Sequence, residues 1–152
     1  MDKIYCTLLV SPPGGGKSTW LKTHQYDLVF DDMSVLPNGL KDFAKQIKAN
    51  QRVAIADINF CDYEILKKAW GKLSEIAENQ NLNIEFSHIL FIGEKKQYIK
   101  NVDARDDGRN VKASIERFYP QIQKLVNIDI GKKEIVNIHF YEKLPIKTKL
   151  VC

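Results

Sequence analysis

The chain has few cysteines, few arginines and no long apolar run. Its 152 residues include only Cys6, Cys61 and Cys152, which lie far apart and outside any CxxC pattern. This spacing indicates neither a disulfide framework nor a zinc site, so we expect a reducing, cytoplasmic setting, the host cytoplasm if the chain is phage-encoded. No segment approaches the run of about 18 apolar residues that a membrane span requires.

The chain also lacks a concentrated basic region. Its formal net charge is +4, but the lysines are scattered, with adjacent pairs only at 67–68, 95–96 and 132–133. A dedicated nucleic-acid binder clusters basic residues on one face, so the charge alone indicates such a partner only weakly. The length predicts one domain, 1–152, large enough to bury its own core.

The stretch 11–19, SPPGGGKST, matches the phosphate-binding pattern GxxxxGK[ST] except that Ser11 replaces the first glycine. Glycines let backbone N–H groups turn toward a bound phosphate, because no Cβ blocks the approach. We expect Lys17 to reach the β- and γ-phosphates and the Ser18 hydroxyl to bind Mg²⁺. The alternative to a phosphate-binding loop is a glycine-rich turn without this function, followed by a surface lysine. The cofactor-binding residues that we expect here are Pro13, Gly14, Gly15, Gly16, Lys17, Ser18 and Thr19.

The flanks of this loop support the motif, and the rest of the chain repeats their pattern. Residues 4–10 form an apolar run typical of a central strand, and 18–24 can start a helix whose N-terminus faces the phosphates. Further strands are predicted at 26–30, 52–57 and 84–92, and helices at 40–47, 62–77, 94–102 and 111–125. Strands that alternate with helices predict an α/β fold, a parallel sheet of about five strands with helices on both faces.

Three local features of these elements are also expected. Asp62 is a plausible N-cap of the long helix, and Pro120 should break or kink the last helix. His88, inside a strand, is interpreted as a hydrogen-bonded structural residue, and Trp70 as packing. The C-terminal part, about 127–152, has strand-like runs at 128–130 and 135–141 that form either a hairpin or a fifth strand, followed by a tail.

Carboxylates follow two of the expected strands. Asp31 and Asp32 end the second strand and Asp57 ends the third. In an open parallel sheet the ligand crevice lies outside the carboxyl ends of the strands, so these acids should lie near the phosphate loop. The position of Asp57 is typical of an acid that holds Mg²⁺ directly or through water.

Two of only four arginines, Arg105 and Arg109, lie in the polar segment 103–110. The fixed fork of guanidinium donors suits phosphate oxygens, and its charge never titrates. The segment therefore indicates a loop that closes over a phosphate. Alternatively, it is a solvated loop in which these arginines pair with Asp103, Asp106 or Asp107.

Together, these segments resemble P-loop kinases of the polynucleotide-kinase type, in particular the 5′-hydroxyl kinase domain of the bacteriophage enzyme. The similar segments are 13–20 (PGGGKSTW), 30–32 (FDD), 56–59 (ADIN) and 105–111 (RDDGRNV). The resemblance implies a three-layer P-loop kinase fold, ATP and Mg²⁺ as cofactors, and a lid at about 103–110 that carries Arg105 and Arg109. It also implies that Asp31 is the general base and that the acceptor is a 5′-hydroxyl of DNA or RNA.

One departure from that family concerns the acceptor. The family places an arginine shortly after the acidic pair, whereas this chain continues with 33–36, MSVL. Two other functions therefore stay open: a kinase of a small hydroxyl compound such as a nucleoside or a sugar acid, and a nucleotide-binding module without catalysis. For a kinase, the catalytic residues are Lys17, Arg105 and Asp31, with Asp32 or Asp57 as alternatives for the base.

Overall fold

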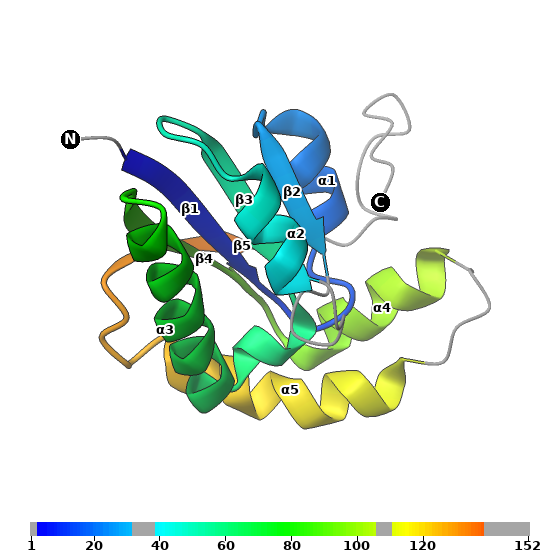
Figure 1. Cartoon of the computed structure of the whole chain (residues 1–152). Coiled ribbons are helices and arrows are strands. Elements are labelled where there is room, and N and C mark those ends of the chain that lie inside the picture. Colours follow the sequence, from blue (N-terminus) through cyan, green and yellow to red (C-terminus); the bar gives the residue numbers. More distant parts are fainter. Residues whose placement is uncertain (1–2, 32–38, 106–110, 139–152) are drawn as a thin grey trace.

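The structure is a computed structural model that describes residues 3–31, 39–105 and 111–138. Strands and helices alternate along this part of the chain, as the sequence predicts (Figure 1). The elements are β1 (Lys3–Val10), α1 (Lys17–Thr23), β2 (Leu28–Asp31), α2 (Gly39–Gln46), β3 (Arg52–Ala56), a short 3-10 helix η1 (Ile58–Cys61), α3 (Tyr63–Asn79), β4 (Asn83–Ile92), α4 (Lys95–Arg105), α5 (Lys112–Leu125) and β5 (Lys132–Asn137).

The five strands form one parallel sheet in the order β2-β3-β1-β4-β5. The apolar strand β1 lies at the centre, where β3 and β4 cover both of its edges. After β1 the chain builds one side of the sheet with β2 and β3, and then crosses to the other side to add β4 and β5. The order therefore reverses at β1, and open α/β sheets bind their ligands at the carboxyl end of such a switch point.

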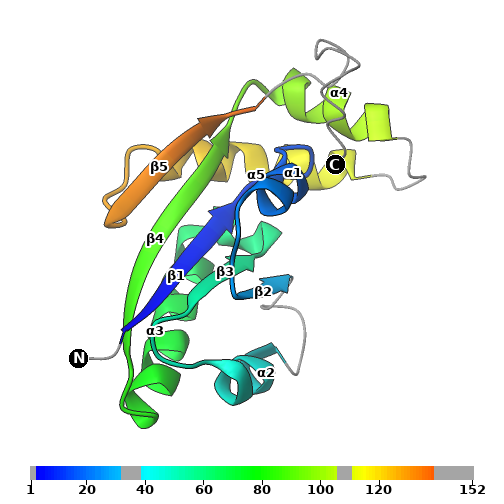
Figure 2. The ribbon, with the colours of Figure 1, turned by 90° about the horizontal axis from the view of Figure 1, so that it is seen from above.

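Helices cover the two faces of the sheet unequally. Alternate β1 side chains, Ile4 and Leu8 among them, pack in one buried cluster with residues of α2, α3 and α5. On the opposite face, Leu9 belongs to a smaller cluster with Tyr98 and Val102 of α4, against which side chains of α1 pack. Figure 2 shows α1 and α4 at the end toward which the arrowheads of β1 and β4 point. The α/β fold with helices on both faces is confirmed.

The long helix begins where the sequence predicts. The Asp62 carboxylate accepts a hydrogen bond of 2.9 Å from the backbone N–H of Glu64, which satisfies one of the unpaired donors of the first turn of α3. The buried residues Leu66, Leu73 and Ala77 then recur on the face that packs against the sheet. No helix in the described part of the chain is long and apolar enough to cross a membrane.

The predictions for the C-terminal part are confirmed in some points and wrong in others. Pro120 does not break the predicted helix, because α5 runs through it to Leu125, while the kink stays a prediction. Proline removes the hydrogen bond to the carbonyl of Glu116, but both residues are exposed, so water can bind that carbonyl. At the C-terminal end, 132–137 form the fifth strand, β5, parallel to β4, which confirms that alternative over the hairpin. Residues 128–130, expected to be strand-like, form no strand. The part of the tail beyond 138 lies outside the described residues.

Candidate phosphate-binding site

The glycine loop lies between the central strand and the first helix, as the motif requires. It leaves β1 after Val10 and enters α1 at Lys17, with the first helical hydrogen bond, 3.0 Å long, from Trp20 N–H to the carbonyl of Gly16. Gly14 and Gly16 have φ angles of 87° and 92°. Side chains with a Cβ rarely adopt this left-handed region, so these two positions favour glycine.

Ser11, the residue that departs from the motif, has a definite place in the loop. Its side chain is fully buried, and its hydroxyl donates a 2.6 Å hydrogen bond to the carbonyl of Pro12. A Cβ on Gly15 would lie 1.8 Å from the Ser11 Oγ. The serine hydroxyl therefore occupies the space beside Gly15, and the absence of a side chain at 15 is what makes room for it.

Helix α4 packs against the other side of the loop. A Cβ on Gly14 would lie 2.3 Å from the backbone oxygen of Tyr98, so helix and loop touch backbone to backbone. One turn further along, the Asn101 side chain donates a 3.0 Å hydrogen bond from Nδ2 to the carbonyl of Gly14. Neither contact could be predicted from the sequence, because the two residues follow Gly14 by more than eighty positions.

Asp57 and Asp31 both lie at the carboxyl edge of the sheet. Asp57 directly follows β3, is fully buried, and accepts a 2.9 Å hydrogen bond from the backbone N–H of Asn59 as the N-cap of η1. Asp31 ends β2 and pairs in register with Ala56, so the two acids follow neighbouring strands at nearly the same level. Asp31 is exposed, and Asp32 lies outside the described residues.

The pKa of the buried Cys61 thiol depends on burial and on two nearby charges. Burial raises the pKa of this thiol far above its usual value, the charge of Lys17 acts to lower it, and the charge of Asp57 acts to raise it. Both charged groups therefore lie close enough to act on the same thiol. Lys17 begins α1 after the loop that follows β1, and Asp57 follows the neighbouring strand β3, so both residues stand at the carboxyl end of the sheet.

The arginine segment is only partly described. We expected a loop over 103–110, but residues 103–105 complete α4, and Arg105 is its last residue. Arg109 lies outside the described residues. Asp103, one of the acids considered as an arginine partner, forms a 3.6 Å ion pair with Lys112 at the start of α5.

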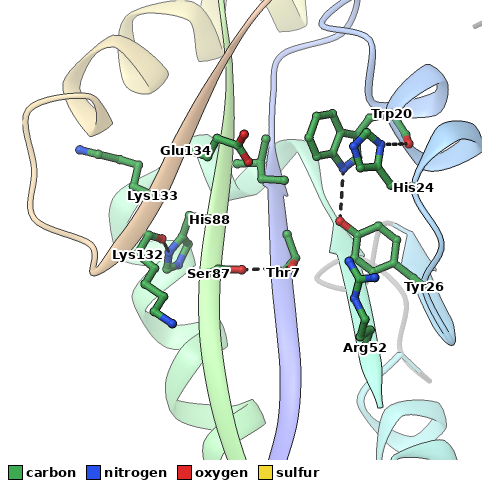
Figure 3. A pocket seen from close by; sticks show the side chains of 11 residues that line it. Thr7, Trp20, His24, Tyr26, Arg52, Ser87, His88, Lys132, Lys133 and Glu134 are labelled. Carbon is green, nitrogen blue, oxygen red and sulfur yellow. Dashed lines mark hydrogen bonds between the residues drawn. The ribbon is translucent and has the colours of Figure 1, made fainter. Parts of the chain in front are cut away.

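A separate hollow of about 420 Å³ lies on the sheet face beside α1 (Figure 3). Its floor includes Thr7 and Ser87, whose hydroxyls are 3.1 Å apart, and one wall includes Trp20, which donates a 3.2 Å hydrogen bond to the Tyr26 hydroxyl. None of the residues that line it belongs to the phosphate loop. Within the described part of the chain, no three His, Cys, Asp or Glu side chains gather into a metal site.

The fold is α/β of the P-loop kinase type, with the glycine loop at the switch point of a five-stranded parallel sheet. No protein-family model and no curated protein matches the chain. Among solved structures, it is similar to the crystal structure of a gluconokinase from Sinorhizobium meliloti 1021, with a TM-score of 0.56 and 10% sequence identity over 95% of this chain and 86% of that chain. At this identity the likeness concerns the fold.

Proposed function

We propose that this chain is an ATP-dependent kinase that transfers the γ-phosphate to a hydroxyl group of a small compound, such as a sugar acid or a nucleoside. The observation that carries the proposal is the position of the glycine loop and Lys17 directly after the central strand β1, at the switch point of the sheet, with Asp57 directly after the neighbouring strand β3. Likeness in fold to a gluconokinase favours a small acceptor over a polynucleotide. So does the absence of an arginine shortly after the pair Asp31-Asp32, where the chain continues with 33–36, MSVL.

Phosphoryl transfer depends mainly on positioning and on electrostatic stabilisation, because the protein supplies little covalent chemistry. In the proposal, the backbone N–H groups of 13–19 hold the phosphates of ATP. Lys17, at the first position of α1, contacts the β- and γ-phosphates. The charges of Arg105 and Arg109 stabilise the transferring phosphate group in this proposal.

The residues present fit a magnesium ion. Mg²⁺ prefers oxygen ligands and is usually held by one or two protein oxygens together with phosphates and water. Ser18 has an exposed hydroxyl in the first turn of α1, and Asp57 supplies a carboxylate at the end of β3. These two residues would hold the ion, which when bound neutralises phosphate charge.

Asp31 is the proposed general base. Its exposed carboxylate stands at the carboxyl end of β2, on the edge of the sheet that also carries the phosphate loop. An acceptor hydroxyl bound there would lose its proton to this carboxylate as it attacks the γ-phosphate. Asp32 and Asp57 are the alternatives for this role.

A second candidate function is the transfer of phosphate to the 5′-hydroxyl of DNA or RNA. The observation in its favour is the similarity of segments 13–20, 30–32, 56–59 and 105–111 to the polynucleotide-kinase type. The mild net charge of +4 is compatible with either acceptor.

The deciding experiment supplies γ-labelled ATP and Mg²⁺ to the full chain, with three acceptor sets: sugar acids including gluconate, nucleosides, and 5′-hydroxyl oligonucleotides of DNA and RNA. Label in a small acceptor supports the proposal, and label in oligonucleotides alone replaces it with the second candidate. Lys17→Ala is the matched control, because any label that it still transfers comes from a contaminant. Tight ATP binding without label in any acceptor would make the chain a nucleotide-binding module.

A further inference from the structure

Helix α4 contacts the phosphate loop at Gly14 through two contacts one turn apart. The backbone oxygen of Tyr98 lies where a Cβ of Gly14 would stand, and Asn101 donates from Nδ2 to the carbonyl of Gly14 at 3.0 Å. The Asn101 side chain is only 1% exposed. The amide is therefore buried against the loop and shielded from the water that would otherwise compete for this hydrogen bond.

The helix that carries Asn101 is itself held firmly. The Tyr98 hydroxyl donates to the carbonyl of Phe91 near the end of β4, and both Tyr98 and Val102 are buried in the cluster that contains Leu9 of β1. The Asn101 amide is thus a donor fixed by the sheet, and the carbonyl of Gly14 is its fixed acceptor. Gly14 itself carries no side chain that could fix the direction of its carbonyl.

The direction of the Gly14 carbonyl has a consequence for the next peptide N–H. In a trans peptide the carbonyl and the N–H point in opposite directions, and the described residues contain no cis peptide bond. A carbonyl of Gly14 held toward α4 therefore turns the N–H of Gly15 away from α4. A phosphate loop works by directing such N–H groups at the anion.

We propose that Asn101 is a positioning residue of the phosphate site: by holding the Gly14 carbonyl, it orients the Gly15 N–H toward a bound phosphate. This inference rests on the proposed function. The hydrogen bond from Asn101 also connects the loop to the end of α4, since Arg105 follows Asn101 by about one helical turn.

The test compares nucleotide binding by wild type, Asn101→Ala and Asn101→Asp, with calorimetric titration of Mg-ATP. The aspartate has almost the same shape as asparagine, but its ionised carboxylate has no proton to donate to a carbonyl. Loss of one oriented hydrogen bond should weaken binding about tenfold in both variants. As the pH is lowered, the aspartate gains a donor proton, so its affinity relative to wild type should recover, whereas that of Asn101→Ala should not.

The matched control is Gln80→Ala. Gln80 makes the same type of bond, from Nε2 to the carbonyl of Ala44 at 2.6 Å, but it joins α3 to α2 away from the loop. It should leave ATP affinity unchanged. Hydrogen exchange adds a readout without ligand: the amide of Gly15 should exchange faster in Asn101→Ala than in wild type, and at an unchanged rate in Gln80→Ala.

The outcomes separate this inference from the proposed function. A wild-type chain that binds no ATP would refute the proposed function whatever the variants do. A wild type that binds ATP, with Asn101→Ala binding it equally well, would overturn the role of Asn101 and leave the function standing. Asn101→Leu has a side chain of similar size but no donor, so it provides the answer even if Asn101→Ala fails to fold.

Discussion

Trp70 donates its indole N–H to Nε2 of His88 over 2.9 Å. The other ring nitrogen, Nδ1, lies 3.1 Å from the carbonyl of Lys132, to which it donates its proton. The imidazole is therefore neutral in one tautomer and links α3, β4 and β5 through a residue that is only 2% exposed. This confirms the interpretation of His88 as a hydrogen-bonded structural residue.

Acidification should destabilise the fold through His88. Burial lowers the pKa of His88 below its ordinary value of 6.5. The unfolded chain then binds a proton at a higher pH than the folded chain does, so the free energy of unfolding should fall as the pH drops below about 6.5. Urea unfolding followed between neutral pH and about pH 5 measures this slope.

His88→Gln provides the control for that slope. Glutamine has no proton to gain in this range, so the decline in stability between neutral pH and about pH 5 should become shallower in the variant. The variant should also be less stable at neutral pH, by about 1–3 kcal/mol, because the Trp70 N–H loses its fitted acceptor. Equal slopes in the two proteins would assign the acid sensitivity to other groups.

Gly15→Ala should distort the phosphate loop, because the new Cβ would stand 1.8 Å from the Ser11 hydroxyl oxygen. We expect a loss of about 1–3 kcal/mol in the free energy of unfolding, typical of overpacking. Ser11→Gly removes the clashing atoms and restores the first glycine of the motif. The double variant should therefore lose less stability than the sum of the two single ones, measured as a double-mutant cycle in urea.

Strict additivity in that cycle would contradict the contact between residues 11 and 15. A contact with the Cβ of Phe91, 3.1 Å from the new methyl, remains in the double variant, so full recovery is not expected.

Two substitutions of Asp57 should distinguish its role in folding from its proposed role in magnesium binding. Asp57→Asn keeps an oxygen that can accept from the Asn59 N–H, whereas Asp57→Ala loses this cap and should cost about 1 kcal/mol more in unfolding free energy. Both variants lose the carboxylate charge. In transfer assays at varied Mg²⁺, we expect both to need about 10- to 100-fold more metal for half-maximal rate. An unchanged magnesium requirement in Asp57→Asn would remove this residue from the metal site.

Asp31→Asn tests the general base. The residue is exposed at the end of β2, so the substitution should leave the unfolding free energy and the ATP affinity almost unchanged. Phosphate transfer should fall by at least about 100-fold, the effect typical of a lost general base. Undiminished transfer would move the role to Asp32 or Asp57.

The parts of this fold that depend on neighbouring residues could be predicted from the sequence. The apolar run of β1, the glycines after it and Lys17 specify a strand, a loop and a helix within about twenty positions. The Asp62 cap is equally local, because its acceptor and donor are two residues apart. Here local geometry and the identity of each residue determine the structure together.

The parts that depend on distant contacts could not be read in this way. Nothing in the β1 sequence specifies that β3 and β4, and not β2, are its neighbours, since that order depends on the packing of whole helices. The contact of Asn101 could not be predicted for the same reason, because nothing in the residues around this asparagine indicates that its amide contacts Gly14. The prediction of a loop over 103–110 was wrong for 103–105, because these residues form the last part of helix α4.

The central place of β1 also determines when the site can form as the chain is synthesised. β1 leaves the ribosome before its partners on the two sides, which are 52–56 and 83–92. Pairing so distant in sequence is slow, because a long stretch of chain must first close into a loop. Until Ile92 has emerged, an apolar strand stays open on at least one edge. The nascent chain should therefore depend on chaperone protection until β4 has emerged, and the glycine loop after β1 should acquire its shape only then.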